Sequence, residues 1–358
     1  MSRTIIHIGL HKTASTFLQK QFFRSNADTL SYYYNPTELF DLLIPIFEFE
    51  CVSNEWLGCV KKAYQGWRRK YPAETLLLSS ESFSQLLYTQ NYQRHIELLA
   101  DIFGEIEVIL FFRNQVDWLG SVYKETLKSG DYQSFGAFIG QSGNQREMRY
   151  ERFNENDCLM INPSKADWLA LFDCLENQDG INVSHVFFYE DFRDKPSDVL
   201  HRLASILGPR SGDVFTVRAS ARKTVNKGIS GGAIRLLIML ASSKRLFPIP
   251  TGYKAKYELQ KQIMKAGPSS YLDERARQLD LVSLISREIN RVISRLSMYR
   301  LLVLLDKIAP ARFRDIAYAP DLRGVQKEIF DIHLHSNEEL FSRLKRAPIA
   351  EYVSRTFQ

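Results

Sequence analysis

Short apolar runs alternate with segments of helical periodicity across residues 4–207. The four runs lie at residues 4–10, 75–79, 106–112 and 186–189. Behind the first run, apolar side chains recur at helical spacing, at Ala14, Phe17, Leu18 and Phe22. Continuous apolar runs are typical of strands covered on both faces, as in a parallel sheet flanked by helices. The pattern therefore predicts an α/β fold, whose ligand-binding residues follow the carboxyl ends of the strands.

The periodicity becomes purely helical after residue 228. Charged helical segments extend to about residue 308, with a break at Pro248 and Pro250. The apolar segment at residues 298–305 is too short to span a bilayer, so it is predicted to be a core helix. Two regions are thus expected: a core at residues 1–228, and a helical C-terminal region at residues 229–358 that packs on it.

Composition places the chain among ordinary globular proteins. Its 358 residues are 45% hydrophobic and 25% charged, which excludes a disordered chain and a disulfide scaffold. The four cysteines form no C-x-x-C pair and have no histidine at ligand spacing, so no metal and a reducing compartment are predicted. No apolar segment of signal-peptide length follows Met1, and a cytoplasmic protein is expected.

The basic excess is concentrated in one segment. The whole chain carries +6, and residues 214–257 hold nine basic side chains and no acidic one. Since this segment carries +9, the remaining residues together carry −3. Such a segment is either a solvated face or a surface for an acidic partner. No helix-turn-helix, zinc-finger or RNP-like pattern accompanies it, so no nucleic acid is expected, while a peripheral membrane contact by residues 233–247 stays an alternative.

A loop of small and hydroxylated residues connects the first strand to its helix. It reads His11, Lys12, Thr13, Ala14, Ser15 and Thr16. Backbone N–H groups and hydroxyls of such a loop can converge on one anion, which the helix N-terminus also attracts. The Gly-Lys-Ser/Thr of nucleoside-triphosphate loops is missing, because the lysine precedes the small residues. A helix that is merely capped by Ser or Thr is the structural alternative.

This loop resembles the 5′-phosphosulfate loop of sulfotransferases that use 3′-phosphoadenosine 5′-phosphosulfate (PAPS). That loop has the pattern Lys, Ser/Thr, Gly, Ser/Thr, Thr, and Ala14 stands at the position of its glycine. Alanine would cost about 1 kcal/mol if the backbone needed a positive φ there, but it is tolerated in the first turn of a helix. The resemblance implies a P-loop-like parallel sheet, PAPS as co-substrate, and no metal.

Three further matches follow in the order and spacing of that family. Arg113 and Ser121 resemble its 3′-phosphate site, where an arginine precedes a serine by eight positions. Tyr189, in Tyr-Glu-Asp, resembles the tyrosine near the adenine. Arg222 and Lys223 fall where the family has a basic loop over the 3′-phosphate. Taken alone, an arginine after a strand equally suits an ion pair, and a tyrosine there equally suits packing at a sheet edge.

The resemblance covers residues 4–228 and a short piece at residues 336–340. It implies that Lys12 meets the charge that develops on the bridging oxygen as the sulfuryl group leaves. Glu81, just past the second strand, resembles the base of carbohydrate-sulfating members, with a pKa expected to be raised by partial burial. His11 is the competing base. Glu81 also suits an ion pair with Lys12 or a helix cap.

The sequence thus predicts a PAPS-dependent sulfotransferase that acts on a hydroxyl, with a carbohydrate or glycolipid acceptor favoured by the glutamate base. Two alternatives stay open: a phosphate- or nucleotide-binding module without turnover, and a nucleotide-dependent kinase. The acceptor entrance is expected at residues 26–74 and 131–180, whose aromatic side chains suit either sugar stacking or the packing of loops. The sequence indicates neither the oligomeric state nor the role of residues 240–325.

Overall fold

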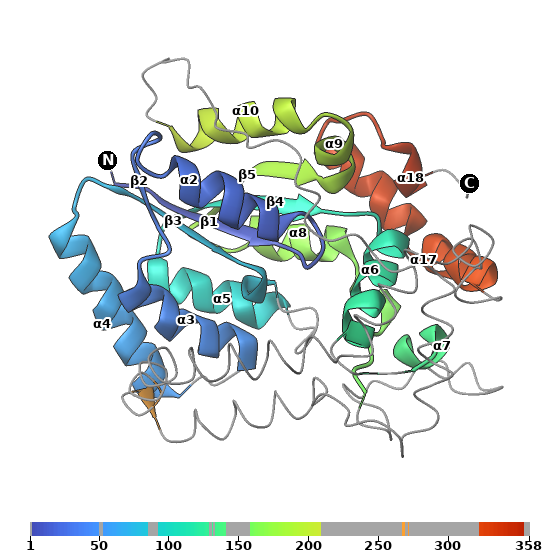
Figure 1. Cartoon of the computed structure of the whole chain (residues 1–358), viewed down its shortest axis with the longest axis horizontal. Coiled ribbons are helices and arrows are strands. Elements are labelled where there is room, and N and C mark those ends of the chain that lie inside the picture. Colours follow the sequence, from blue (N-terminus) through green and yellow to red (C-terminus); the bar gives the residue numbers. More distant parts are fainter. Residues whose placement is uncertain are drawn as a thin grey trace, which may run out of the picture. The chain divides into compact units, whose positions relative to one another are not determined.

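The computed structural model of the chain describes residues 2–49, 53–84, 92–128, 131, 133–140, 158–208, 267–268, 271 and 322–353 (Figure 1). The chain divides into two compact units. The first comprises Met1–Trp118, Ser164–Val225 and Phe330–Gln358, and the second comprises Leu119–Pro163 and Asn226–Ile329. The basic segment at residues 214–257, which includes Arg222 and Lys223, lies outside the described residues. The division expected at residue 228 stays a prediction.

A five-stranded sheet forms the centre of the first unit (Figure 1). Its strands are, in spatial order, β2 (Tyr32–Tyr34), β3 (Thr75–Ser80), β1 (Thr4–Gly9), β4 (Ile106–Phe112) and β5 (Ile181–Phe188). Every neighbouring pair is parallel: Ile8 pairs with Ser80, and Gly9 pairs with Phe111. The predicted α/β fold is confirmed, and the carboxyl ends of β1, β3 and β4 share one edge of the sheet.

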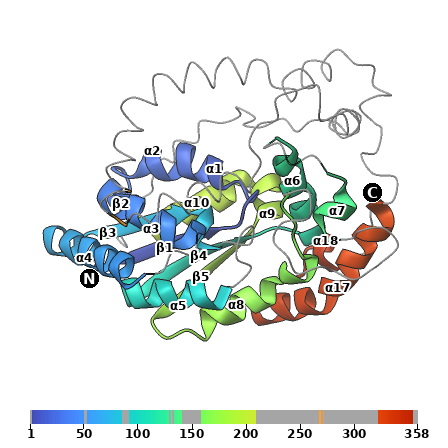
Figure 2. The ribbon, with the colours of Figure 1, turned by 90° about the horizontal axis from the view of Figure 1, so that it is seen from below.

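Helices cover both faces of this sheet (Figure 2). One face carries α4 (Asn54–Lys70), α5 (Tyr92–Phe103) and α8 (Trp168–Glu176). The other carries α10 (Pro196–Leu207) and the continuous helical segment 15–26, whose middle six residues form a π-helix. The remaining described elements are α3 (Thr37–Phe49), η2 (Glu81–Phe83), α6 (Gln115–Lys128), α7 (Phe135–Phe138), η3 (Pro163–Lys165), α9 (Tyr189–Asp194), α17 (Leu322–Arg343) and α18 (Ala350–Val353).

Alternate side chains of the strands form the core beneath the helical segment 15–26. Ile5, Ile109 and Phe187 point to this face, where they pack with Phe22 and Leu203 in one buried cluster. The alternation follows from the two-residue repeat of a strand. Because the segment 15–26 is held by this cluster, the loop that precedes it is anchored at both ends.

Four of the aromatic residues within the expected acceptor entrance are buried. Tyr32, within residues 26–74, belongs to the edge strand β2 and donates its hydroxyl to the Phe23 carbonyl at 2.5 Å. Trp56, Trp67 and Trp168 are all buried. For these four aromatic residues the packing alternative is correct, because a buried ring has no face free for a sugar.

The end of the chain returns to the sheet. Ser336 to Leu340, the terminal piece of the resemblance, lie on α17, where the buried Asn337 exchanges two hydrogen bonds with Gln115. The ring of Phe341 stacks on Phe188 of β5 at 4.9 Å. Residues 330–353 are therefore part of the first unit and are called the C-terminal segment below.

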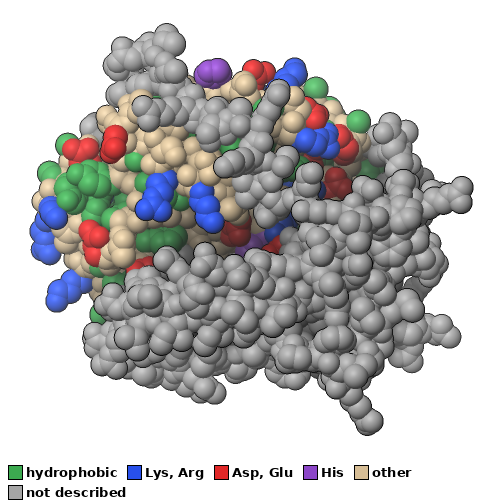
Figure 3. Space-filling view, in the orientation of Figure 1, with side chains coloured by type: hydrophobic (Ala, Val, Ile, Leu, Met, Phe, Trp, Pro, Cys, Tyr) green, Lys and Arg blue, Asp and Glu red, His purple; other side chains and the backbone are tan. Residues whose placement is uncertain are grey.

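One face of the described residues carries charges of both signs. On the face drawn in Figure 3, lysine and arginine side chains lie among aspartate and glutamate side chains. Among the described residues, no helix is both long and apolar enough to cross a membrane.

Candidate functional site

The loop after β1 passes twice through the left-handed backbone region. Lys12 and Ala14 both have a φ of 66°, and Ala14 is the N-cap of the helical segment 15–26. An L-residue in this region costs about 1–2 kcal/mol, which glycine avoids. The expectation that Ala14 lies unstrained in a first helical turn is wrong, because Ala14 precedes that turn and takes the conformation that favours glycine.

The hydroxyls of Thr13 and Ser15 face the inside of the loop. Thr13 is buried and donates to the Leu10 carbonyl at 2.7 Å, and Ser15 lies 3.1 Å from the same oxygen. Ser15 also bonds with the carboxylate of Glu81. A hydroxyl has a single proton, so each of the two is engaged within the loop and shapes it. The contact of Thr13 and Ser15 with a phosphosulfate stays a prediction, as does that of the loop's backbone N–H groups.

Gly9 gives the loop room to close, a requirement that the sequence reasoning missed. A Cβ at Gly9 would lie 2.6 Å from Ser15 Oγ and 2.8 Å from His7 Cε1. Both distances are shorter than carbon and oxygen atoms tolerate without contact strain. His7 and Ser15 are buried and hydrogen-bonded, so neither can move aside freely. A small residue at the end of a strand, just before a hydroxyl-rich loop, is the signal that indicates this close approach.

Replacing Gly9 with alanine is therefore expected to destabilise the protein by about 1–3 kcal/mol, the usual cost of overpacking. Gly58 is the matched control, since a Cβ there would meet no described atom within 4 Å beyond its neighbours in the chain and the backbone of its own helix. Because Gly58 lies inside α4, its alanine variant should gain about 0.5–1 kcal/mol. Urea unfolding measures both changes. Equal unfolding free energies for wild type and Gly9→Ala would contradict the close approach of strand end and loop.

Arg113 connects the end of β4 to the loop. Its Nη1 donates to the Lys12 carbonyl at 2.8 Å, and its guanidinium carbon lies 4.4 Å from the centroid of the Tyr189 ring. Its Nε is buried and has no hydrogen-bond partner among the described residues. The structure thus brings together three residues predicted from separate motifs: Lys12, Arg113 and Tyr189. The ligand-binding roles of Arg113 and Tyr189 stay predictions, as do the alternatives of an ion pair and of packing at a sheet edge.

His11 and Glu81 meet at the ends of β1 and β3. His11 Nδ1 lies 3.0 Å from Glu81 Oε2, a hydrogen-bond distance. We assign the ring proton to Nδ1, which leaves the lone pair on Nε2. That Nε2 is buried and has no hydrogen-bond partner among the described residues. Glu81 does not cap η2, because the Ser80 hydroxyl does so by accepting from the Ser82 N–H.

The carboxylate of Glu81 is held in its charged form. Burial by itself would raise the pKa of Glu81, but the imidazole of His11, the ammonium of Lys12 and the hydroxyl of Ser15 hold that pKa below its usual value. The expectation of a raised pKa is wrong, because these groups together outweigh burial. A carboxylate with a lowered pKa is a weaker base, so Glu81 is better suited to orient His11 than to take a proton itself.

His7 lies directly beneath the loop and was missed by the sequence reasoning. Its ring contacts Phe23 and Phe111 at centroid distances of 5.0 and 5.4 Å, and its Nδ1 bonds to Ser79 Oγ at 2.7 Å. Burial lowers the pKa of His7 to about 3, so this ring is neutral at pH 7. A histidine within an apolar strand is the available signal, and it fits a core residue that supports the loop.

The other predicted site residues are less constrained by the structure. Thr16 is half-buried in the first turn of the helical segment 15–26. Ser121 is half-buried on α6 and belongs to the second unit, so its part in a 3′-phosphate site stays a prediction. Arg222 and Lys223 lie outside the described residues and also stay predictions. Within the described residues, no group of three or more His, Cys, Asp or Glu side chains is arranged to hold a metal ion.

Two solved structures are similar to this chain. One is a crystal structure of a sulfotransferase from Alicyclobacillus acidocaldarius, with 15% identity, 68% of this chain and 92% of that chain covered, and a TM-score of 0.41. The other is a sulfotransferase domain from the curacin biosynthetic pathway, with 14% identity, 74% of this chain and 98% of that chain covered, and a TM-score of 0.33. No family model and no curated protein matches the sequence.

Proposed function

We propose that this protein is a sulfotransferase that moves the sulfuryl group of PAPS to an acceptor hydroxyl. One observation carries the proposal: the guanidinium of Arg113 bonds to the carbonyl of Lys12 and lies over the ring of Tyr189. These three residues come from three motifs far apart in the sequence, each of which resembles a different part of a PAPS site. A contact among them supports one shared ligand more strongly than any of the motifs alone.

The described residues fit a nucleotide with two separate anionic ends. Lys12 and the backbone N–H groups of the loop would hold the 5′-phosphosulfate, where the helix N-terminus also favours negative charge. Arg113 would hold the 3′-phosphate, and its buried Nε, which has no partner among the described residues, is a donor available for that role. Tyr189 would lie against the adenine. The choice of PAPS as the sulfuryl donor rests on the resemblance of the motifs. The fit of a nucleotide to the site rests on the positions of these side chains and N–H groups.

The proposed reaction breaks the S–O bond to the phosphate and forms an S–O bond to the acceptor. Adenosine 3′,5′-bisphosphate leaves with the bridging oxygen, and the acceptor hydroxyl gives up its proton. Such a transfer passes through a loose transition state, so the protein contributes mainly position and charge. Lys12 would neutralise the charge that grows on the bridging oxygen, because its ammonium is a point charge on a flexible stem.

His11 would take the proton of the acceptor hydroxyl. With Nδ1 donating to Glu81, the Nε2 lone pair is the free basic position of the pair. Glu81 would fix the tautomer and stabilise the imidazolium that forms, as a carboxylate does in catalytic triads. The proposal therefore gives His11 the role of base and Glu81 the role of its orienting partner.

The acceptor in this proposal is a hydroxyl of a carbohydrate or glycolipid. The argument for a sugar depended on Glu81 acting as base, and the pairing with His11 weakens that argument. Transfer of radiolabelled sulfuryl from PAPS into extracts of glycans, glycolipids and phenols tests the acceptor class. Label in the phenol fraction alone would exclude a carbohydrate.

Adenosine 3′,5′-bisphosphate is expected to raise the melting temperature, whereas ATP with Mg²⁺ should not. A ligand at one hundred times its Kd stabilises the native state by about 2.7 kcal/mol, which thermal denaturation resolves easily. The Arg113→Ala variant should lose most of this stabilisation at the same ligand concentration, since its guanidinium would bind the 3′-phosphate. Arg202→Ala is a suitable control, because Arg202 lies on α10, where its guanidinium stacks on Phe187 in the core.

Two results of the binding experiment would contradict the proposed sulfotransferase function. Stabilisation by ATP with Mg²⁺ and none by the bisphosphate would favour a kinase. Stabilisation by the bisphosphate without any transfer of sulfuryl from PAPS, to extracts or to water, would favour a binding module without turnover.

A further inference from the structure

Three consecutive residues at the end of β4 are each held by a distant part of the chain. The Arg113 carbonyl accepts from Trp168 Nε1 at 2.6 Å, and the Asn114 N–H donates to Glu190 Oε1 at 3.0 Å. Gln115 exchanges bonds of 2.8 and 3.1 Å with Asn337 of the C-terminal segment. The backbone that carries Arg113 is thus fixed from several sides.

Glu190 is the buried centre of this arrangement. Its side chain is only 2% exposed, and its second oxygen accepts from the Tyr352 hydroxyl at 3.0 Å. Tyr352 itself is fully buried. Burial raises the pKa of the Glu190 carboxyl, and the Asn114 N–H, the Tyr352 hydroxyl and the charge of Arg113 act in the opposite direction. A buried carboxylate is stable only when its oxygens have partners, so Tyr352 keeps Glu190 in place to receive the Asn114 N–H.

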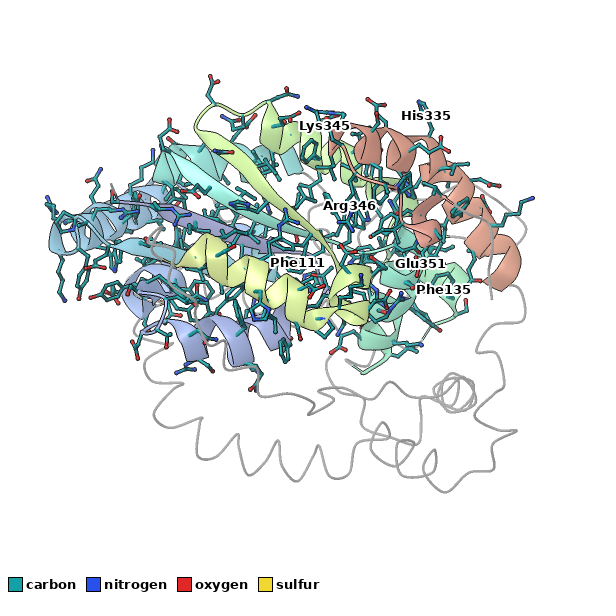
Figure 4. The ribbon with its side chains drawn as sticks, turned by 90° about the horizontal axis from the view of Figure 1, so that it is seen from above. Phe111, Phe135, His335, Lys345, Arg346 and Glu351 are labelled. Atoms are coloured by element: carbon teal, nitrogen blue, oxygen red, sulfur yellow. The ribbon has the colours of Figure 1, made fainter. Side chains whose placement is uncertain are left out.

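The C-terminal segment is itself anchored at this position. Asn114 Nδ2 donates to the Glu351 carbonyl, and Arg346 Nη2 lies 2.5 Å from both carboxylate oxygens of Asp191. Figure 4 shows Arg346 and Glu351 on the C-terminal segment, beside α9. Asn114 Oδ1 meanwhile caps α6 by accepting from two of its first N–H groups, at 3.1 and 3.2 Å. One asparagine therefore joins the end of β4, the start of α6 and the C-terminal segment.

We infer that Tyr352 and Glu190 are positioning residues for Arg113, so that the C-terminal segment controls the affinity of the site for the 3′-phosphate end of a nucleotide. The identity of the ligand in this inference rests on the proposed function. The hydrogen bonds that carry the inference are independent of that function. The chain of contacts runs from the Tyr352 hydroxyl through Glu190 to the Asn114 N–H, one residue from Arg113. Neither Tyr352 nor Glu190 is assigned any contact with substrate.

Hydrogen exchange without ligand tests the positioning itself. The Tyr352→Phe variant removes one hydroxyl, and we expect faster amide exchange in the peptide that contains Asn114. Tyr32→Phe is the matched control, because Tyr32 is also buried and donates its hydroxyl to a carbonyl, that of Phe23. The control should leave exchange at Asn114 unchanged. Unchanged exchange at Asn114 in Tyr352→Phe would overturn the inference.

A double-mutant cycle on the affinity for adenosine 3′,5′-bisphosphate tests the link to Arg113. Tyr352→Phe is expected to weaken binding about tenfold in the presence of Arg113, and to have no further effect in the Arg113→Ala background. Glu190→Gln, which keeps the side-chain volume, should behave in the same way. A loss of the same size in both backgrounds, or an equal loss in Tyr32→Phe, would show a general structural role and overturn the inference.

Failure of the proposed function gives a different result. If the wild-type protein binds no bisphosphate at all, the PAPS proposal falls, and the exchange experiment still decides whether Tyr352 and Glu190 position the end of β4. If the wild type binds and the cycle is additive, the proposed function stands and the positioning role falls.

Discussion

Replacing Lys12 with alanine is expected to lower kcat for sulfuryl transfer by about 10²–10³-fold, the usual cost of removing one donor that stabilises developing charge. Affinity for PAPS itself should change only a few-fold, because the bridging oxygen acquires its extra charge in the transition state and not in the bound donor. Alanine keeps a Cβ at a residue with a φ of 66°, so the backbone strain of the loop is unchanged. The Arg113 bond to the residue 12 carbonyl also stays available.

The measurement is the rate at which radiolabelled sulfuryl leaves PAPS for the acceptor found in the extract screen, or for water where none is found. Lys20→Ala is the matched control, since Lys20 is exposed on the same helical segment and its loss removes an equal charge. The control should retain the wild-type rate. A Lys12→Ala enzyme with a normal kcat and a lowered affinity for the nucleotide would show that Lys12 only binds the donor.

The fold could be predicted from the sequence because its strands are long apolar runs. β1, β3 and β4 are buried on both faces, so hydrophobicity alone marks them. β2 could not be found in this way, since it is a three-residue edge strand of tyrosines whose pairing with β3 depends on tertiary structure. Gly208 ends α10 as the sequence predicts, because glycine after the last apolar position is a local signal.

The residues of the candidate site that directly follow a strand could be predicted from the sequence. The direction in which a side chain points could not. Arg113 follows β4 directly, and the parallel sheet brings it to the loop. Whether the Thr13 hydroxyl turns toward an anion or toward the Leu10 carbonyl is decided by rotamers and packing, which leave no trace in the residue pattern. The left-handed backbone of Ala14 is hidden for a related reason, since alanine gives no sign of a positive φ.

The contact of Tyr352 with Glu190 illustrates the same limit over a longer range. The two residues are 162 positions apart, and a lone tyrosine near the end of a chain has no distinguishing pattern. Glu190 belongs to the Tyr-Glu-Asp element, but the resemblance gives a role only to its neighbour Tyr189. Such a pair is defined by the need of buried polar atoms for partners, which the residue pattern does not record.

Removal of the His11 imidazole, as in His11→Ala, is expected to lower kcat by about 10²–10⁴-fold, the range for losing a general base. Glu81→Gln should lower kcat by about 10²-fold or more for a different reason. A glutamine amide can donate to Nδ1, which would place the ring proton on Nε2 and remove the lone pair that takes the acceptor proton. His201→Gln and Glu74→Gln are controls, because both residues are exposed, His201 on α10 and Glu74 in the connection before β3.

The double variant His11→Ala/Glu81→Gln separates the two roles. If Glu81 acts only through His11, the double variant should be no slower than His11→Ala alone, because residues that act as one unit are strongly non-additive. If Glu81 is the base and His11 only its neighbour, Glu81→Gln should carry the larger loss. Full turnover by Glu81→Gln would exclude Glu81 from both roles.

The pH dependence of kcat gives an independent decision between the two bases. The neighbouring His11, Lys12 and Ser15 hold the pKa of Glu81 below its ordinary value of 4.5, so Glu81 stays ionised throughout the range above about pH 5.5. Loss of activity as the pH falls through that range must then report protonation of another group, and it should disappear in His11→Ala. If the loss persists in His11→Ala and disappears in Glu81→Gln, the carboxylate of Glu81 is the base. Bound substrates must then raise the pKa of Glu81, against the direction that its neighbours impose in the free protein.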